Sequence, residues 1–476
     1  MSVDGYDRKK AKIRVQKAKI TKILMITYSI IQKSQLEGAL RLDAEYYQLE
    51  YLDVEKKLNA VKTKFLEDLA ESILSFGAYS LTSNIEWQDK GIPYLNVGDI
   101  YDGYINYSDV KHISERVDEI LQKSRIREGD VVLTMAGTIG NAAVTYNIKS
   151  DHINGNQAIA KIKLKEGLSP YYLVAFLNSK YGQLQIRREI VSSVQANIFL
   201  GQIKKLKIPV FDTNVIKKTG SLYLGFLKEI ENSKSLYQQA ENLLLEELGL
   251  KNFSEEENLS SVINLSDIKS AHRMDAEYFQ SRYDKLIRKI KNNSKKLEIF
   301  IKSYSTGFPY KSENYQEAGT PLIRINNIKK GVLDLNDTAY LSEKDCKISL
   351  KDEAKSGDIV LSMSGTIGVS AIIPDDILKS YVNQRILKFT SKDINRDYLV
   401  LLLNSIVGLY QLERIGTGGV QTNISYKDIK NILIPILPEK TQQKIADLVR
   451  QSHEARKKAK ELLEEAKRKV EELIEK

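Results

Sequence analysis

The chain contains the same pattern twice. Residues 129–140 read GDVVLTMAGTIG and residues 357–368 read GDIVLSMSGTIG, so the second copy lies 228 positions after the first. A duplication on this scale indicates two similar modules arranged about a pseudo-two-fold axis. Each module could then contact its own part of one extended ligand.

The repeat can be followed through many segments in chain order, which distinguishes it from a chance match of one short motif. The offset drifts only between 232 and 226 residues, so insertions are few and small, and the repeat units are about 28–250 and 260–476. The matching segments are ALRLDAEYYQ (39–48) with AHRMDAEYFQ (271–280), GIPYLNVGDI (91–100) with GTPLIRINNI (319–328), NGNQAI (154–159) with YVNQRI (381–386), YLVAFLNS (172–179) with YLVLLLNS (398–405), VQANI (194–198) with VQTNI (420–424), and IKKLKIPV (203–210) with IKNILIPI (429–436).

The composition is that of two ordinary globular domains. With 476 residues and 42% hydrophobic content, the chain can bury two cores of common domain size. Cys346 is the only cysteine and the four histidines are scattered, which argues against a disulfide framework and a thiolate metal cage. The apolar run 23–31 is too short to span a bilayer and no secretory signal is visible, so we expect a cytoplasmic protein. The net charge of +10 is compatible with a phosphate-bearing partner but does not require one.

Each repeat has the same internal plan, which predicts an α+β fold. It begins with a short strand and a helix, for which Ser34 and Ser266 are candidate N-caps. The middle part alternates β-rich runs with Gly, Asn and Asp turns, a pattern typical of irregular sheet. A single apolar helix follows, with Ser169 or Asp397 at its start, and the repeat closes with a strand and a long helix.

The long final helices carry an apolar seam. Its residues are spaced alternately by three and four positions, which places them along one side of a helix. We therefore expect the two tails to lie against each other, and the alternative is that each helix packs only on its own domain. The seam residues are Tyr223, Phe226, Ile230, Ser233, Tyr237, Ala240 and Leu244 in the first tail, and Ile445, Leu448, Ser452, Ala455, Ala459, Leu462 and Ala466 in the second.

The order module, long helix, module, long helix, with the GTIG motif in each module and NQ-x-Ile downstream, resembles the specificity (S) subunit of type I restriction–modification enzymes over about residues 28–476. The resemblance implies a subunit without catalysis of its own. Two target recognition domains would each read one half of a split sequence in double-stranded DNA through the major groove. The two helices would set the spacing between the halves and dock two methyltransferase (modification) subunits. These subunits, with restriction or translocation subunits, would supply the chemistry. S-adenosylmethionine, ATP and magnesium would belong to those partners, and no cofactor is expected in this chain.

The expected fold class is α+β, with two similar α/β target recognition domains related by a pseudo-two-fold and separated by two long helices that form an antiparallel coiled coil. Residues 1–27 stand outside the repeat and form a basic extension, either a flexible tail or a source of non-specific attraction to DNA. The expected segments are this extension (1–27), recognition domain 1 (28–211), a central spacer helix (212–259), recognition domain 2 (260–437) and a C-terminal spacer helix (438–476).

The sequence offers no motif for catalysis or nucleotide binding. It has no Asn/Asp-Pro-Pro-Tyr/Phe stretch like that of amino-methyltransferases and no P-loop. AGTIGN and SGTIGV follow strands but lack a lysine for a nucleotide phosphate, so we interpret them as tight turns whose glycines allow positive φ or close backbone approach. Thr138 and Thr366 in these turns are candidate phosphate contacts.

The pairs Asn156-Gln157 and Asn383-Gln384 could clamp adenine edges. Modules that read different sequences should not share their reading residues, so we interpret the two pairs as scaffold. The readers should instead lie where matching loops diverge, because Arg and Lys can pair with guanine and Asn with adenine. The alternative for each lysine is contact with phosphate or solvent only. The candidates are Tyr79, Asn96, Tyr101, Tyr104, Asn141, Asn154 and Gln195 in the first module, and Lys311, Arg324, Asn326, Asn327, Lys329, Lys330 and Arg385 in the second.

The long helices give the expected recognition unit a scale. A helix of about 30 to 35 residues spans roughly 45 to 50 Å, against about 34 Å for one turn of B-DNA, so two domains could enter one major groove several base pairs apart. Two other interpretations remain open. A self-contained modification enzyme would need a pocket for S-adenosylmethionine, whereas a duplicated protein-binding scaffold would have no sequence-specific affinity for DNA.

Overall fold

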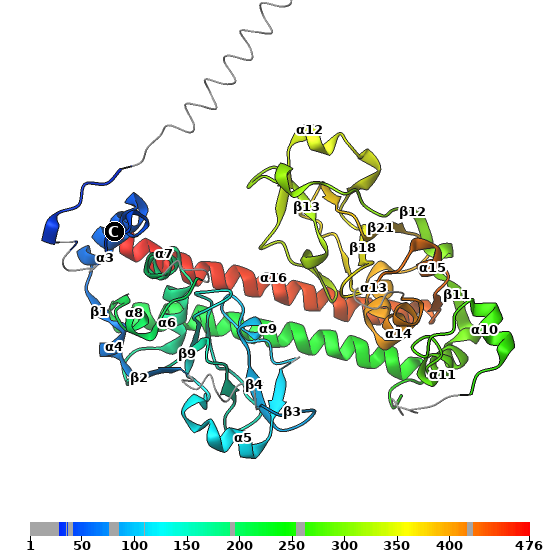
Figure 1. The fold of residues 1–476 in the computed structure, drawn as a ribbon, viewed down its shortest axis with the longest axis horizontal. Helices are drawn as coiled ribbons and strands as arrows, with labels where there is room; N and C mark the ends of the chain where they lie inside the picture. The colour runs from blue at the N-terminus through cyan, green and yellow to red at the C-terminus, as the bar shows by residue number, and fades with distance from the viewer. Residues whose placement is uncertain are drawn as a thin grey trace, which may run out of the picture. The chain divides into compact units, whose positions relative to one another are not determined.

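The computed structural model describes residues 28–34, 36, 41–75, 85–108, 110–190, 196–253, 262–416 and 422–476. The chain divides into two compact units: unit 1 runs to Glu229 and adds Lys458–Lys476, and unit 2 is Ile230–Lys457. Each unit therefore contains one copy of the repeat and a part of each long helix, α9 (Thr213–Glu247, green in Figure 1) and α16 (Glu439–Glu475, red). The predicted basic extension, residues 1–27, lies outside the described residues.

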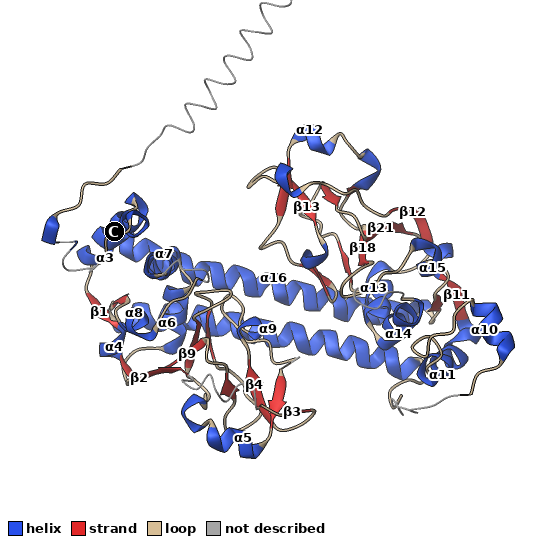
Figure 2. Ribbon diagram, in the orientation of Figure 1, coloured by secondary structure: helices blue, strands red, loops and turns tan. Residues whose placement is uncertain are grey.

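Unit 1 is built around two sheets with helices on them (Figure 2). The first is antiparallel, in the order β2-β9-β6-β7, and the second has the order β3-β5-β4-β8 with β4 and β8 parallel. The short pair β1-β10 joins the start of the repeat to its closing strand. The strands are β1 (Thr63–Phe65), β2 (Ala70–Ser75), β3 (Trp87–Gln88), β4 (Ile92–Leu95), β5 (Lys111–Ile113), β6 (Val131–Thr134), β7 (Ala142–Val144), β8 (Asn154–Gly155), β9 (Ile159–Leu164) and β10 (Lys207–Pro209). The helices before α9 include α3 (Leu49–Ala60), α4 (Leu66–Leu69), α5 (Glu115–Ile120), α6 (Pro170–Leu177), α7 (Lys180–Glu189) and α8 (Leu200–Lys204).

Unit 2 repeats this topology strand for strand in its first sheet, β12-β21-β18-β19, and in its closing pair β11-β22. Its second sheet, β16-β13-β20-β17, keeps the parallel pair at β13-β20 but has a different edge strand. The strands are β11 (Ser294–Lys296), β12 (Ile301–Ser305), β13 (Thr320–Ile323), β14 (Ile328–Lys329), β15 (Val332–Leu333), β16 (Ala339–Leu341), β17 (Glu353–Ala354), β18 (Ile359–Ser362), β19 (Ser370–Ile372), β20 (Ser380–Val382), β21 (Ile386–Ser391) and β22 (Leu433–Pro435). The helices before α16 include α10 (Leu265–Ala271), α11 (Ser281–Ile290), α12 (Glu343–Cys346), α13 (Arg396–Asn404), α14 (Ile406–Ile415) and α15 (Tyr426–Ile429). The predicted mixture of α and β structure in two similar modules with long helices is confirmed.

The apolar segment predicted as one helix in each repeat is in fact two helices, α6-α7 and α13-α14. The break lies at the repeated Asn-Ser pair, where buried Asn404 is the last residue of α13 and its side chain pairs with the backbone of β19. Its Nδ2 donates to the carbonyl of Ser370 (2.8 Å) and its Oδ1 accepts from the Ser370 amide (3.0 Å). Asn178 makes the same two bonds to Ala142 in unit 1. β19 is an edge strand, and the buried side-chain amide satisfies backbone groups that a neighbouring strand would otherwise bond. This role of the asparagine explains why the helical segment breaks here.

Two of the predicted helix starts are wrong, and a third is displaced. Ser34 lies within a helical stretch rather than before one, and Ser266 lies inside α10, whose N-cap is Asn264. Asn395 caps α13 instead of Asp397, because its Oδ1 accepts bonds from two backbone amides of the first turn. Ser169 precedes α6 as predicted.

The long helices pack against each other inside each unit and run antiparallel there. In unit 1, the α16 residue Leu462 lies beside Gly225, and Lys458 lies 2.5 Å from Glu229. From Gly225 to Glu229 the contact moves four residues towards the C-terminus of α9, while on α16 it moves four residues towards the N-terminus, from Leu462 to Lys458. In unit 2, the Ser452 hydroxyl donates to the carbonyl of Ser233 (2.7 Å). These contacts favour the expected pairing of the tails over separate packing.

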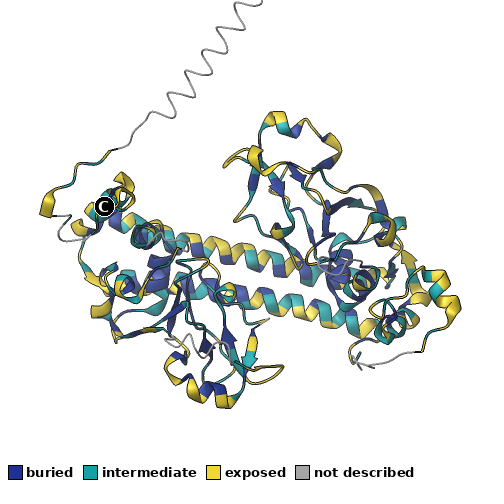
Figure 3. Ribbon diagram, in the orientation of Figure 1, coloured by how far each residue is buried: buried dark blue, intermediate teal, exposed yellow. Residues whose placement is uncertain are grey.

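The predicted seam residues of α9 follow its buried line, whereas the buried line of α16 is shifted from the prediction in part (Figure 3). Leu448 and Leu462 are only half-buried, whereas Val449 and Leu463, one position further, are buried. A straight helix has 3.6 residues per turn, so its buried line drifts away from a strict alternation of three and four. The remaining predicted seam residues are buried except Tyr237, which packs on the core of unit 2: Tyr223, Phe226, Ile230, Ser233, Ala240, Leu244, Ile445, Ser452, Ala455, Ala459 and Ala466.

Candidate nucleic-acid interface

The repeated sequence motifs meet at one place in each unit. In unit 2, the Met363 amide donates to the carbonyl of Arg385 (2.9 Å), and the Ile424 amide donates to the carbonyl of Met363 (3.0 Å). The Asn383 amide donates to the carbonyl of Ile323 (2.9 Å). These bonds tie the GTIG, NQ-x-Ile, VQ-x-Asn-Ile and G-x-P motifs to one another. The repeat thus preserves a backbone frame.

Unit 1 contains the same frame. The Met135 amide donates to the carbonyl of Ala158 (2.7 Å), the Ile198 amide donates to the carbonyl of Met135 (3.0 Å), and the Asn156 amide donates to that of Leu95 (2.9 Å). Ala158 therefore occupies the position that Arg385 has in unit 2. The frame is shared, and the side chain that it carries differs.

The GTIG motif is a tight turn, as the sequence predicted. Gly137 and Gly140 have φ of 70° and 94°, and their counterparts Gly365 and Gly368 have 71° and 82°. The hydroxyl of Ser362 donates to the carbonyl of Thr366 across the turn. A Cβ on Gly368 would lie 2.7 Å from the side chain of Leu412, which would have to shift, and the positive φ itself favours glycine. Thr138 and Thr366 stand exposed at the two tips, where contact with phosphate remains a prediction.

The Asn-Gln pairs have a mostly structural role. Asn156 Oδ1 accepts from the Ala158 amide (2.9 Å), and Asn383 Nδ2 donates to the Tyr315 hydroxyl (3.0 Å). Gln384 is exposed, however, and lines the cavity described next.

Unit 2 has an open cavity of about 710 Å³ on this frame. The described residues that line it include no carboxylate. Of the four basic residues that line it, Arg324 pairs with Asp337 and Lys330 with Glu241, and the positive charge that remains favours a phosphate-bearing ligand. Two residues interpreted as scaffold, Asn383 and Gln384, line it as well. The predicted DNA contacts that line it are Arg324, Asn326, Lys329, Lys330, Thr366 and Arg385.

Arg385 is the most constrained of these side chains. It is exposed and has φ of 66°, a left-handed conformation that costs a non-glycine residue about 1 to 2 kcal/mol. Its guanidinium donates to the Oδ1 of Asn423, a residue of the shared VQ-x-Asn-Ile motif that sequence reasoning did not single out. The only sequence signal for Asn423 would have been that a residue conserved in both repeats can orient a side chain that differs between them.

Arg324 and Asn327 bracket a short 3-10 helix beside the cavity. The Arg324 amide donates to Asn327 Oδ1 (2.8 Å), while Asn327 Nδ2 donates to the carbonyl of Asp334 (2.9 Å). Asn327 is buried, so the prediction that it reads DNA is corrected: its amide holds the loop together. Arg324 keeps one guanidinium nitrogen, Nε, without a hydrogen bond, and a second donates to the carbonyl of Asp337.

The hairpin tip after this helix packs on the long helices in both units. In unit 2, Lys330 Nζ lies 3.1 Å from Glu241 of α9, and Gly331 packs on Tyr237. In unit 1, Asp102 lies 2.6 Å from Lys467 of α16, and Gly103 packs on Phe226 and Leu463. Lys330 is exposed, as is Lys329, but it has an intramolecular partner, which weakens its prediction as a base reader.

Several predicted contacts in unit 1 serve the fold. Tyr104 stacks on Tyr101 and meets Phe226 of α9 edge-on, so this aromatic pair belongs to the docked tip. Asn141 Nδ2 donates to the carbonyl of Ile100 (2.9 Å), and Asn96 starts a 3-10 helix through its amide bond to Asp99. These positions hold loops in place, and a direct role in reading DNA is not indicated for them.

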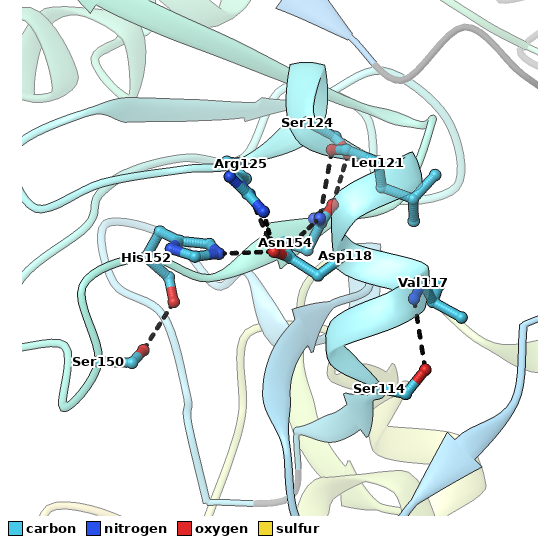
Figure 4. Close-up of polar contacts among 10 residues, drawn as sticks. Ser114, Val117, Asp118, Leu121, Ser124, Arg125, Ser150, His152 and Asn154 are labelled. Atoms are coloured by element: carbon cyan, nitrogen blue, oxygen red, sulfur yellow. Dashed lines mark hydrogen bonds and ion pairs between the residues drawn. The ribbon is translucent and has the colours of Figure 1, made fainter.

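Asn154 is a clear correction, because it is fully buried. Figure 4 shows its polar contacts with Asp118 and Ser124. Its Nδ2 donates to Asp118 Oδ1 (2.9 Å), and its Oδ1 accepts from the Ser124 hydroxyl (2.5 Å). Burial alone would raise the pKa of Asp118, but hydrogen bonds from Arg125, Asn154 and His152 outweigh it and hold that pKa below its usual value. The counterpart of Asn154 in unit 2 is Tyr381, also buried. The two units therefore differ at this position because each places a different polar side chain in its core.

The remaining predictions have mixed placements. Tyr79 and Gln195 lie outside the described residues. Lys311 is exposed but is not among the residues that line the cavity. Within the described ranges, no cluster of His, Cys, Asp and Glu could hold a metal ion. No helix in that same part of the chain is both long and apolar enough to cross a membrane.

Comparison with known proteins identifies the family. The sequence pattern of the type I restriction modification DNA specificity domain matches residues 59–241 and again 277–467. A putative type I restriction enzyme MjaX specificity subunit of Methanocaldococcus jannaschii is 23% identical, over 86% of this chain and 91% of that protein. The MjaVIII specificity subunit of the same organism is 22% identical, over 80% of this chain and 84% of its own length. A crystal structure of a type I restriction–modification S subunit from M. genitalium is 15% identical and covers 87% of this chain and 96% of that chain, with a TM-score of 0.39.

The comparisons support DNA recognition and give no support to a duplicated protein-binding scaffold without sequence-specific DNA binding. The chain therefore belongs to the type I restriction–modification DNA specificity family, the DNA sequence-recognition components of these systems.

Proposed function

We propose that each unit reads one half of a bipartite DNA target through the major groove, and that α9 and α16 set the number of base pairs between the halves. Unit 2 would use the side chains around its cavity, above all Arg385, and unit 1 the equivalent surface. Catalysis would belong to two methyltransferase subunits and to restriction or translocation subunits. Those partners would bind S-adenosylmethionine, ATP and magnesium, and the complex would act in the cytoplasm.

One observation supports the proposal most strongly. The same backbone frame carries Ala158 in unit 1 and Arg385 in unit 2, with the carbonyl of each bonded to the equivalent methionine amide. A reading domain needs this combination, because a constant frame must present a side chain that varies with the sequence to be read. The strained backbone of Arg385 and its bond to Asn423 orient the guanidinium before any ligand arrives.

The chemistry of the guanidinium suggests the base. An arginine that reaches a base edge in the major groove pairs most often with the O6 and N7 of guanine, in two parallel hydrogen bonds. Such a contact is worth about 1 to 3 kcal/mol of discrimination, or roughly 5- to 150-fold in affinity. We therefore expect a guanine in the half-site read by unit 2, at a position where unit 1, with Ala158, makes no such contact.

Substitution of Arg385 tests this proposal in the complex with its modification subunits. We expect Arg385→Gly to relax the sequence preference at one base pair of one half-site and to leave the other half-site unchanged. Glycine adopts positive φ without strain, so the free energy of unfolding should not fall. The measurement is binding to a set of duplexes in which each target base pair is replaced in turn.

Arg385→Lys separates the two kinds of contact. It keeps the charge but loses the paired hydrogen bonds, so it should share the relaxed preference of Arg385→Gly. A phosphate contact would behave differently: Arg385→Gly would weaken binding equally on all sequences and reduce its salt dependence by about one ion. That result would contradict base reading by Arg385.

A further inference from the structure

Each hairpin tip makes its ion pair with the long helix of the other repeat. In unit 1, Asp102 of the first repeat lies 2.6 Å from Lys467 of α16, the helix that ends the second repeat. The neighbouring Gly103 packs on Leu463 of the same helix. The first module is thus completed by a helix that the second repeat supplies.

Unit 2 has the same contact with its charges reversed. Lys330 of the second repeat lies 3.1 Å from Glu241 of α9, the helix of the first repeat, and Gly331 packs on Tyr237 of that helix. The offset of 226 residues between the ends of the repeats places Glu241 at the position of Lys467. The two tips therefore use equivalent positions with opposite charges.

This reversal affects which helices a module can accept. Because the repeats share a topology, a tip could also dock on the long helix of the same repeat in a second chain, and such an exchange of equivalent elements is a low-cost route to dimers. In a pair of first repeats, Asp102 would then face Glu241. In a pair of second repeats, Lys330 would face Lys467. Both contacts join like charges, and the side chains of Glu241 and Lys467 are only 15% and 12% exposed, so solvent would screen the repulsion little.

The seam between the long helices carries a second selective contact. Ser233 of α9 and Ser452 of α16 are both buried in unit 2, and their hydroxyl oxygens lie 3.0 Å apart. The same offset places Ser452 at the position of Phe226 in the first tail, and Ser233 at the position of Ala459 in the second. Two first tails would bring Ser233 against Phe226, and two second tails would bring Ser452 against Ala459. Either pair leaves a buried hydroxyl without its partner, and a buried polar pair can fix which helices associate.

We propose that the reversed tip charges and the Ser233–Ser452 pair form a pairing code. The code directs each module onto the long helix of the other repeat in its own chain and rejects the same repeat of a second chain. It is independent of what the two units bind. It explains why the tip residue and its partner on the helix diverge together between the repeats, since opposite charges meet only when unlike repeats pair.

The test reverses both tips in the full chain, Asp102→Lys with Lys330→Glu, which leaves the net charge unchanged. Within one chain, both tip contacts then join like charges. Between two chains that pair through like repeats, both contacts join opposite charges. We expect the unmodified chain to sediment as a monomer at micromolar concentration in analytical ultracentrifugation, and the variant to form dimers, with a dissociation constant of the dimer lower by roughly tenfold or more.

The matched control adds the reversals on the helices, Glu241→Lys and Lys467→Glu, to the same variant. Opposite charges then meet again within one chain, so this fourfold variant should return to the monomer. A dimer that persists in it would contradict the code.

A second variant, Ser233→Ala with Ser452→Ala, keeps the native tips and small side chains in the seam, so it should fold even if the reversed tips do not. After refolding from denaturant, it should contain a larger fraction of dimer than the unmodified chain, because the penalty on pairing of like tails is removed. This variant decides the test alone if the reversed tips prevent folding. Folded variants that stay as monomeric as the unmodified chain would overturn the pairing code.

Discussion

The hairpin tips that dock on the long helices use ion pairs of opposite polarity in the two units. Asp102 pairs with Lys467 in unit 1, and Lys330 pairs with Glu241 in unit 2. When Ile203 and Ile429 of the closing segments are aligned, Lys467 falls at the position of Glu241. The same contact has thus been kept with its charges exchanged. Asp102→Lys with Lys467→Glu should therefore rebuild in unit 1 the pair that unit 2 already has.

The burial of Lys467 and Asp102 determines how much their ion pair contributes to the free energy of unfolding. The Lys467 side chain is 12% exposed and that of Asp102 is 49% exposed, so the pair is intermediate between surface and interior. Burial alone would lower the pKa of Lys467, but Asp102 and Glu464 raise it above its usual value. Exposed pairs contribute about 0.2 to 1 kcal/mol, while breaking a fully buried pair costs about 3 to 5 kcal/mol. We expect each single reversal to lower the free energy of unfolding by about 2 kcal/mol, and the double reversal to recover it to within about 1 kcal/mol.

Trp87, the only tryptophan, lies in β3 of unit 1 and reports on the unfolding of that unit. Denaturant unfolding followed by its fluorescence gives the four free energies of the double-mutant cycle. The control cycle reverses Glu71 and Lys163, an exposed pair 2.8 Å apart in the same unit, and should show a coupling below about 1 kcal/mol. Equal coupling in the two cycles, or single reversals without cost, would refute the reasoning that this contact fixes the tip on the helices.

Two further predictions concern unit 2. Gly368→Ala should lower the free energy of unfolding by about 1 to 3 kcal/mol in denaturant titrations, because its Cβ would meet Leu412 at 2.7 Å in a backbone with φ of 82°; an unchanged midpoint would contradict the assigned role of the turn. Burial lowers the pKa of His453, which faces Asp397, Arg456 and the backbone of Gly331, so the unfolded chain takes up its proton first as the pH falls below about 6.5. The melting temperature should therefore drop more between pH 7.5 and 5.5 for the unmodified chain than for His453→Gln, and parallel drops would show that His453 does not titrate in this way.

The sequence predicts the architecture well because segments that share a sequence pattern in the two repeats adopt the same backbone structure. Segments shared by both copies form the same sheets, and the paired glycines of GTIG do adopt positive φ. Local details were harder to predict. The seam on α16 follows Val449 and Leu463 rather than Leu448 and Leu462, because the buried line of a straight helix drifts away from a strict alternation of three and four residues.

The candidate site was predicted only in part, and for an identifiable reason. The sequence predicts that residues which read DNA lie where the repeats diverge, and the position of Arg385 at the cavity agrees with that rule. Asn154 and Lys330 diverge for other reasons: Asn154 belongs to a buried polar cluster that unit 2 builds differently, and Lys330 to an ion pair of exchanged polarity. A sequence does not reveal whether a divergent side chain points to a ligand or to the interior.

The most direct test of the account is the selection of bound duplexes from a random DNA pool by the complete complex of this chain with its modification subunits. We expect two short conserved sequences separated by a fixed number of unspecified base pairs, with the guanine contacted by Arg385 in one of them. A single contiguous sequence, or no sequence preference, would contradict the claim that two duplicated units each read half of one target.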